Sequence, residues 1–166
     1  MLGAPRIIDL EDVPVQEVVR VDYSDGRRAS VHERFLETSP RMFTFHNRWD
    51  PGAMSLRHGH QADHIVFVLD GEVQVGERLC RKGTHIFLMH GDRFGPWIAG
   101  PKGCELLGVI AGNPAAFWTD EDMAEFDALL ASHDAALGSV PPIKHIPPGC
   151  RKRPPCPSRP TRVGNQ

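Results

Sequence analysis

"HGHQADHIVFVLDGE", residues 58–72, places three histidines within seven residues and directly before an apolar run. Alternate residues of an extended chain share a face, so His58 and His60 point the same way. His64 follows after three residues and opens the next strand. If the two strands are neighbours, three imidazoles converge from one face, and neutral imidazole binds Zn, Fe, Ni and Cu. The spacing therefore predicts a three-histidine metal site with open positions.

The segments around this stretch carry the signals of short strands. Apolar or alternating runs occupy residues 41–49, 64–69, 72–76, 84–89 and 104–111. The run at 64–69 is apolar on both sides, which is typical of a strand buried on both faces. Glycines, prolines and aspartates separate the runs, and Asp70-Gly71 predicts a hairpin turn. Short strands at this spacing predict an all-β sandwich or barrel rather than alternating strands and helices.

One helix is predicted after the strands. In "TDEDMAEFDALLASH", residues 119–133, apolar residues recur at helical spacing. Thr119 and Asp122 resemble a capping box, and acidic residues fill the first turn, where the helix dipole favours them. We expect Gly138 to end this segment and the helix to cover one face or edge of the sheet.

The C-terminal segment differs in composition from the rest of the chain. Residues 139–166 hold eight of the 15 prolines, six of the 19 Lys and Arg residues, and no Asp or Glu. Such a segment cannot build a core. We therefore expect one domain over residues 1–137 and a basic, proline-rich, disordered tail over residues 138–166, which is dispensable for folding beyond Gly138.

Composition excludes several classes of function. The chain before the tail has 13 basic and 21 acidic residues and is therefore net acidic. An acidic protein binds the phosphates of nucleic acid poorly. There is no run of 18 apolar residues, and the N-terminus lacks the pattern of a signal peptide, so we expect a cytoplasmic protein without a membrane span. The cysteines have no disulfide-like spacing, and we expect Cys80 and Cys104 to be reduced core residues.

The histidine stretch resembles the first motif of the cupin superfamily. That motif reads Gly, five residues, His-x-His, three or four residues, Glu, six residues, Gly. This chain matches every spacing, with His64 in the glutamate position, through Gly52, His58, His60, His64 and Gly71. The motif core extends over residues 52–98.

The second cupin motif is recognisable but altered. The family pattern reads Gly, five residues, Pro-x-Gly, two residues, His, three residues, Asn. Here Gly83 and Gly91 are kept, while Phe94 stands in the histidine position and Ile98 in the asparagine position. The resemblance implies a jelly-roll barrel that holds one metal ion inside. Carried over by position, His58, His60 and His64 remain as ligands, and Phe94 cannot be one.

Other residues are candidates for the surroundings of the metal. If residues 93–99 are extended, Phe94 and Ile98 share the inner face and line an apolar pocket, and Trp97 points outward. His46 is expected to face the barrel and approach the metal. Glu105 is a candidate acid or base. A mostly apolar cavity with a few polar groups suits a small organic ligand.

Three functions follow from the resemblance. The first is an enzyme that acts on a small organic molecule: with one Fe(II), the ion that we favour, it resembles the three-histidine dioxygenases, whereas Zn, Ni or Mn suits an isomerase, lyase or cyclase. The second is a ligand-binding or sensor cupin without turnover. The third is a structural cupin without metal. We also expect a homodimer that pairs through the N-terminal strands, residues 15–21 and 28–35.

Overall fold

The computed structural model describes residues 5–147, which form one short 3-10 helix, twelve strands and one α-helix. In chain order the elements are η1 (Leu10–Asp12), β1 (Gln16–Tyr23), β2 (Arg28–Thr38), β3 (Phe43–Trp49), β4 (Met54–Ser55), β5 (His58–Gln61), β6 (His64–Val75), β7 (Arg78–Arg81), β8 (His85–Leu88), β9 (Arg93–Phe94), β10 (Trp97–Ile110), β11 (Asn113–Phe117), α1 (Asp120–Ser132) and β12 (Ala135–Leu137).

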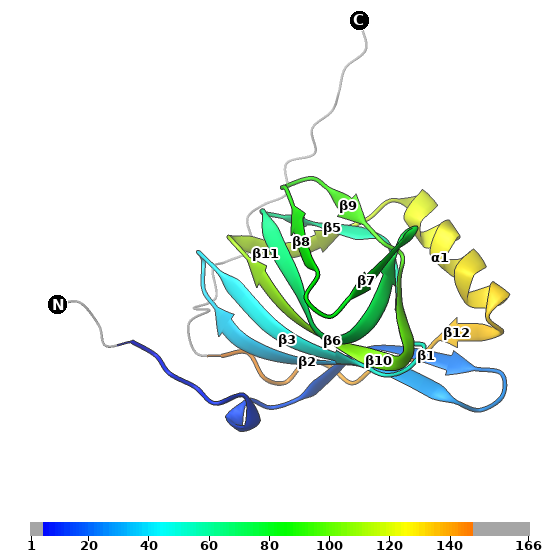
Figure 1. Ribbon diagram of the computed structural model, residues 1–166, viewed down its shortest axis with the longest axis horizontal. Helices are drawn as coiled ribbons and strands as arrows, with labels where there is room; N and C mark the ends of the chain where they lie inside the picture. Colours follow the sequence, from blue (N-terminus) through cyan, green and yellow to red (C-terminus); the bar gives the residue numbers. More distant parts are fainter. Residues whose placement is uncertain (1–4, 148–166) are drawn as a thin grey trace, which may run out of the picture.

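The strands form two antiparallel sheets that curl toward each other as a barrel (Figure 1). The larger sheet has the order β12-β1-β2-β3-β10-β6-β7, with β4 paired to β10 and β8 to β6. The smaller sheet has the order β11-β5-β9 and lies across the opening of the larger one. The predicted class, an all-β jelly roll with one helix near the C-terminus, is confirmed.

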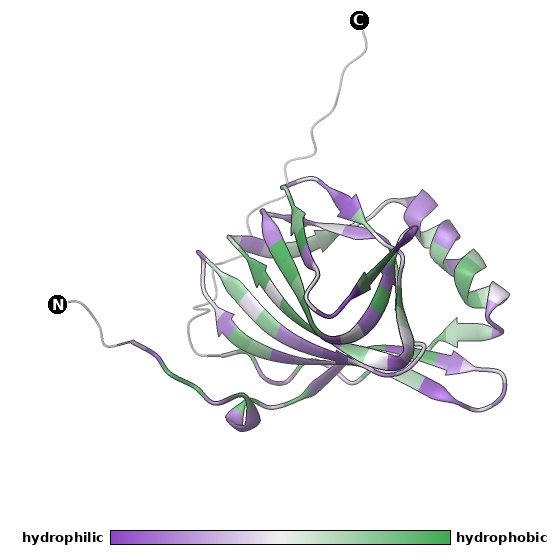
Figure 2. Cartoon of the chain, viewed as in Figure 1, coloured by the Kyte–Doolittle hydropathy of each residue, from purple (hydrophilic) through white to green (hydrophobic). Residues whose placement is uncertain are grey.

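The barrel interior is the main core. Polar and apolar residues alternate along most strands (Figure 2), so one face of each strand is buried. Val66 and Val68 on β6 are buried at 4% and 0% exposure, whereas Phe67 between them is 37% exposed. The prediction that residues 64–69 are buried on both faces is therefore wrong, because only the barrel side of β6 is covered within this chain.

The predicted hairpin at Asp70-Gly71 is also wrong. Strand β6 continues through these residues, and β10 continues through residues 100–103 beside them. Their register shifts between Ala99 and Cys104, where Gly71 (φ 68°) lies opposite Cys104. A Cβ atom on Gly71 would lie 2.2 Å from the Gly103 carbonyl oxygen. The glycines thus allow both strands to bend together around the barrel instead of ending there.

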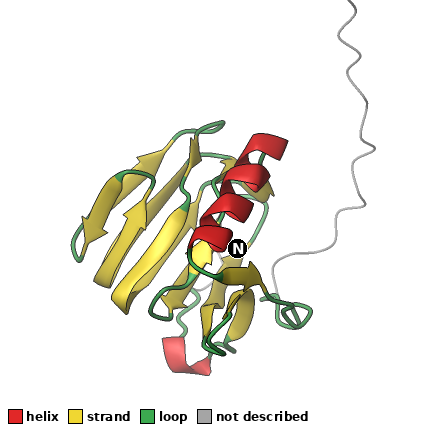
Figure 3. Ribbon diagram, turned by 90° about the vertical axis from the view of Figure 1, so that its right-hand side faces the viewer, coloured by secondary structure: helices red, strands yellow, loops and turns green. Residues whose placement is uncertain are grey.

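Helix α1 confirms the predicted capping box. The Thr119 side chain accepts a hydrogen bond from the Asp122 amide, and the Asp122 side chain accepts one from the Thr119 amide. The helix packs on a second apolar cluster that includes Val21, Met54 and Phe126, and it lies across the strands in the side view (Figure 3). It ends at Ser132, before Gly138, because the chain turns back into β12, which pairs with β1.

Residues 138–147 lie along β1. The Gly138 amide donates to the Arg20 carbonyl oxygen, and the Gln16 side chain bonds to the backbone of Lys144 and His145. The rest of the expected tail, residues 148–166 with Cys150 and Cys156, lies outside the described residues. Cys80 and Cys104 are buried free thiols. The helices within residues 5–147 are too short or too polar to cross a bilayer.

Candidate metal centre

The three histidines of the opening stretch meet inside the barrel. His58 and His60 lie on β5, and His64 is the first residue of β6. The His60 ring contacts both others edge to face, with ring centroids 5.1 Å from His58 and 4.9 Å from His64. All three line one cavity of about 50 Å³. Two consecutive strands that belong to different sheets therefore bring the predicted residues together.

Hydrogen bonds to the backbone determine which nitrogen of each ring carries the proton and which keeps a lone pair. His58 Nδ1 lies 3.0 Å from the Leu56 carbonyl oxygen, and His60 Nδ1 lies 2.8 Å from the Pro114 carbonyl oxygen. A carbonyl oxygen only accepts, so Nδ1 of each ring donates, and Nε2 of each neutral ring keeps its lone pair. Neither nitrogen of the buried His64 ring makes a hydrogen bond of normal geometry. The cavity therefore contains imidazole nitrogens without protein partners.

The surroundings keep the three rings neutral. Burial lowers the pKa of His58 and of His60 below the ordinary value. Burial and the neighbouring His60 and His58 lower the pKa of His64 to about 4. Because a metal ion competes with protons for imidazole, a ring that is neutral at physiological pH is ready to coordinate.

Gly59 has a packing reason to separate the two histidines of β5. A Cβ atom at this position would lie 2.5 Å from the Asp92 carbonyl oxygen and 2.6 Å from the Phe117 ring. The small sheet formed by β11, β5 and β9 closes tightly at this point. The glycine therefore lets both neighbouring strands approach while His58 and His60 point into the barrel.

Phe94 lies where the resemblance to the second cupin motif predicts it. It pairs with His58 across β5 and β9, and its ring centroid lies 5.3 Å from that of His58 and 4.9 Å from that of His64. An apolar ring therefore stands beside the histidines where the second cupin motif has its own histidine. The rest of the cavity lining is mostly apolar: Phe45, Trp49, Val66, Trp97 and Leu106.

The prediction that Ile98 lines the pocket with Phe94 is wrong. Trp97 is buried and lines the cavity, with its ring 4.9 Å from that of Phe94, whereas Ile98 packs against the apolar cluster beneath α1. Strand β9 ends at Phe94 and β10 begins at Trp97. The two residues between the strands interrupt the alternation on which the prediction rested.

His46 and Glu105 also lie away from the predicted pocket. On β3, Phe45 and Asn47 line the cavity, so His46 between them faces the outer side of the sheet. On β10, Leu106 faces inward and Glu105 faces outward. His46 Nε2 and Glu105 Oε2 lie 3.5 Å apart on that outer side. The sequence assigned His46 to the wrong face of its strand.

Sequence reasoning missed Asn47. It lies between Phe45 and Trp49 on the inner face of β3 and is 8% exposed. Its Oδ1 atom is buried without a hydrogen bond. The sequence signal for this position is a polar residue, Asn47, that alternates with the aromatic residues Phe45 and Trp49 on one face of the strand.

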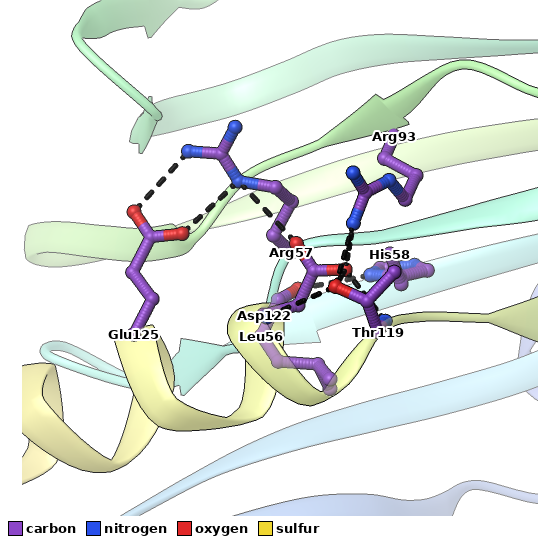
Figure 4. Close-up of polar contacts among 7 residues, drawn as sticks. All are labelled: Leu56, Arg57, His58, Arg93, Thr119, Asp122 and Glu125. Atoms are coloured by element: carbon purple, nitrogen blue, oxygen red, sulfur yellow. Dashed lines mark hydrogen bonds and ion pairs between the residues drawn. The ribbon is translucent and has the colours of Figure 1, made fainter.

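Ion pairs with α1 anchor the strands that carry the site (Figure 4). Asp122, buried at the start of α1, binds Arg93 of β9 and lies 3.8 Å from Arg57 Nε, just before β5. Arg57 also pairs with Glu125. Burial opposes ionisation of Asp122, but hydrogen bonds from Thr119 and Arg93 outweigh it and lower its pKa. The helix therefore holds the residues next to His58 and Phe94 through the carboxylates of Asp122 and Glu125.

The histidine rings do not form a ready coordination sphere. Within residues 5–147, no group of three His, Cys, Asp or Glu side chains could hold a metal ion as the side chains stand. The rings meet edge to face, with centroids 5.1 Å and 4.9 Å apart. The donor chemistry nevertheless fits a divalent ion, because three neutral imidazoles share one cavity and His64 makes no hydrogen bond of normal geometry.

No protein-family model and no curated protein matches the sequence. Solved structures do match the fold. The polyketide cyclase RemF from Streptomyces resistomycificus is 20% identical with a TM-score of 0.58, over 75% of this chain and 94% of that one. An RmlC-like cupin from Shewanella frigidimarina is 18% identical with a TM-score of 0.52, over 69% and 96%.

A sugar phosphate isomerase from the cupin superfamily of Silicibacter pomeroyi is 23% identical with a TM-score of 0.53, over 69% of this chain and 82% of that one. These similarities establish the fold that the histidine motif predicted. The chain has the cupin fold, a jelly-roll barrel with a histidine cluster inside.

Proposed function

We propose that this cupin-fold protein binds one divalent metal ion through His58, His60 and His64 and acts on a small organic molecule. The observation that carries the proposal is the meeting of three neutral imidazoles in one cavity. Two of them have Nδ1 held by a carbonyl oxygen, and neither nitrogen of the third makes a hydrogen bond of normal geometry. Partners that hold the second nitrogen are typical of metal-binding histidines.

The protein residues around the ion have separate roles. The carbonyl oxygens of Leu56 and Pro114 fix the tautomers of His58 and His60. Phe94, which packs against His58 and His64, adds no ligand, so a position on the ion stays open for an exchangeable one. The aromatic and aliphatic lining excludes water and favours a ligand with an apolar part.

We favour Fe(II), with dioxygenase-like oxidoreductase activity. When bound, the ion supplies either oxygen chemistry, in the case of Fe(II), or Lewis-acid polarisation of a substrate, in the case of Zn, Ni or Mn. The second choice corresponds to an isomerase, lyase or cyclase. It is supported by cupin-fold neighbours described as a polyketide cyclase and a sugar phosphate isomerase. A ligand-binding cupin without turnover is the alternative outside catalysis. We expect the protein in the cytoplasm.

Metal analysis tests the proposal directly. Full-length protein purified without added metal should contain close to one equivalent of one divalent ion by elemental analysis, which also identifies the ion. His58→Ala, His60→Ala and His64→Ala should each lose most of it, because two imidazoles make a poor site. His85→Ala and His133→Ala, on exposed side chains, serve as controls. Full metal content in all three cavity variants would refute the site.

A further inference from the structure

The inner face of β2 carries a carboxyl group that the proposed histidine site does not use. Glu33 lies directly opposite Asn47 in the antiparallel pairing of β2 with β3. The pairs on either side are Val31 with Trp49 and Phe35 with Phe45. Directly paired residues project to the same face of a sheet. Because the three β3 residues line the cavity, Glu33 projects into the barrel interior as well.

Glu33 is half-buried, and its neighbours along β2 are apolar. Its neighbours on the same face of β2, Val31 and Phe35, are only 2% and 8% exposed. The Glu33 carboxyl makes no hydrogen bond or ion pair within residues 5–147. Burial raises the pKa of Glu33 to about 8. The group is therefore protonated near neutral pH and can both donate and accept a hydrogen bond.

Asn47 supplies a second unpaired group at the same place. The residue is 8% exposed, and its Oδ1 atom has no hydrogen-bond partner. Proteins pair nearly all buried polar atoms, and the exceptions often serve a ligand. Asn47 and His64 line one cavity, so an unpaired amide and an unpaired imidazole face the same space.

We propose that Glu33 and Asn47 form a hydrogen-bonding subsite inside the barrel for the hydroxyl or carbonyl oxygen of a small organic acid. The carboxylate of that acid would bind the ion that His58, His60 and His64 would hold, so this assignment rests on the proposed metal site. The carbon chain between the two polar ends lies against the apolar lining. The ligand class is therefore a short hydroxy- or oxo-carboxylic acid.

Binding of simple acids tests the subsite. The probes are glycolate, 3-hydroxypropanoate and 4-hydroxybutanoate, each compared with the alkanoate that lacks the hydroxyl group. Affinities are measured by calorimetry on the full chain, both metal-free and with one equivalent of Zn²⁺. At least one hydroxy acid should bind roughly five- to tenfold more tightly than its alkanoate, the range expected for one or two hydrogen bonds.

Variants test which residues cause the tighter binding of the hydroxy acid, called the gain below. Glu33→Met and Asn47→Leu keep the approximate size of the side chain and should remove most of the gain. Glu33→Gln can still donate and accept, and it should keep the gain within about threefold. Glu105→Gln, on the outer side of β10, is the matched control and should behave as the wild type. Circular dichroism identifies any variant that fails to fold, and if Glu33→Met does not fold, Asn47→Leu carries the comparison with Glu105→Gln.

The outcomes separate this subsite from the metal site. A hydroxyl gain that is absent from the wild type, or that persists in Glu33→Met, overturns the subsite even if metal binding is normal. Loss of the gain in Glu105→Gln together with Glu33→Gln also overturns it. A gain that depends on Glu33 in a protein that binds no metal supports the subsite and refutes the proposed function.

Discussion

At the scale of single residues, His64 has the most unusual surroundings. It is 3% exposed, and neither ring nitrogen makes a hydrogen bond of normal geometry. Burying an imidazole without a partner costs stability, about 1–3 kcal/mol for a typical polar group. A bound ion would remove this cost and stabilise the folded state in proportion to its concentration over its Kd. The residue that replaces the usual cupin glutamate is therefore the centre of the proposed site.

Phe94→His should tighten metal binding. The new imidazole would stand beside His58 and His64, where the phenyl ring now lies, and would add a fourth ligand. Competition with a chelator should show at least a tenfold lower Kd, while any activity should fall because the exchangeable position is filled. Phe94→Leu is the control for the loss of the ring. An unchanged Kd in Phe94→His would place this side chain outside the coordination sphere.

The raised pKa of Glu33 predicts a pH-dependent stability. Between its ordinary value of 4.5 and about 8, the unfolded chain loses the Glu33 proton while the folded chain keeps it. Stability therefore falls as pH rises through this range and levels off above it, by at most about 1.4 kcal/mol per unit of pKa difference. The paired side chains, Gln16 and Asn47, carry no charge that offsets this effect.

Glu33→Gln should abolish this pH dependence of stability. Its melting temperature relative to the wild type should rise from pH 4.5 to pH 8, whereas that of Glu105→Gln should follow the wild type. The measurement is thermal unfolding of metal-free protein at several pH values. A difference between Glu33→Gln and the wild type that is the same at every pH would show that Glu33 ionises normally.

At the scale of elements, the small sheet depends on α1. Strands β5 and β9 are four and two residues long, too short to be stable alone. Asp122 holds both through Arg57 and Arg93, and the same carboxylate caps its own helix (Figure 4). The positions of His58 and Phe94 therefore depend on the first turn of α1.

Asp122→Asn should loosen this arrangement. It removes the charge between two arginines and weakens the cap, which we expect to cost on the order of 2 kcal/mol and several degrees of melting temperature. Metal affinity should fall as well, because Arg93, next to Phe94, loses its carboxylate partner and Arg57, next to His58, keeps only Glu125. Asp127→Asn, on the exposed side of α1, is the control. Wild-type metal affinity in Asp122→Asn would mean that β5 is held without the helix.

At the scale of the whole molecule, the C-terminal segment contributes to the body. Removing every residue after Gly138 deletes the backbone groups that bond to Gln16. We now expect this truncation to lower the melting temperature by a few degrees, about 1 kcal/mol, instead of leaving it unchanged. A chain that ends at Pro147 should melt like the full chain. Equal melting temperatures for all three would restore the boundary predicted at residue 137.

We also expect a homodimer. The edge of β1 is partly covered by β12 and by the chain after Gly138, whereas β6 and β8 expose Phe67 and Phe87 at 37% and 57%. Light scattering at micromolar concentration should give twice the mass of the 18.4 kDa chain. A monomer would contradict the prediction. A dimer that persists in the double variant F67S/F87S would place the contact on the N-terminal strands.

The sequence by itself determined the fold class and the histidine cluster. Alternating runs dictate strands, Thr119 and Asp122 cap the helix, and the spacing of His58, His60 and His64 brings them together. These features depend on local periodicity and on neighbours along the chain. They do not depend on how the two sheets pack against each other.

Only the tertiary structure decided which face each strand presents and where it bends. Ile98 and His46 were assigned to the interior because alternation was extended across breaks and without a known partner strand. Gly71 was assigned to a turn because its bend is visible only beside Gly103. Glu33 and Asn47 meet through pairing between strands, which the order of residues along one strand does not specify.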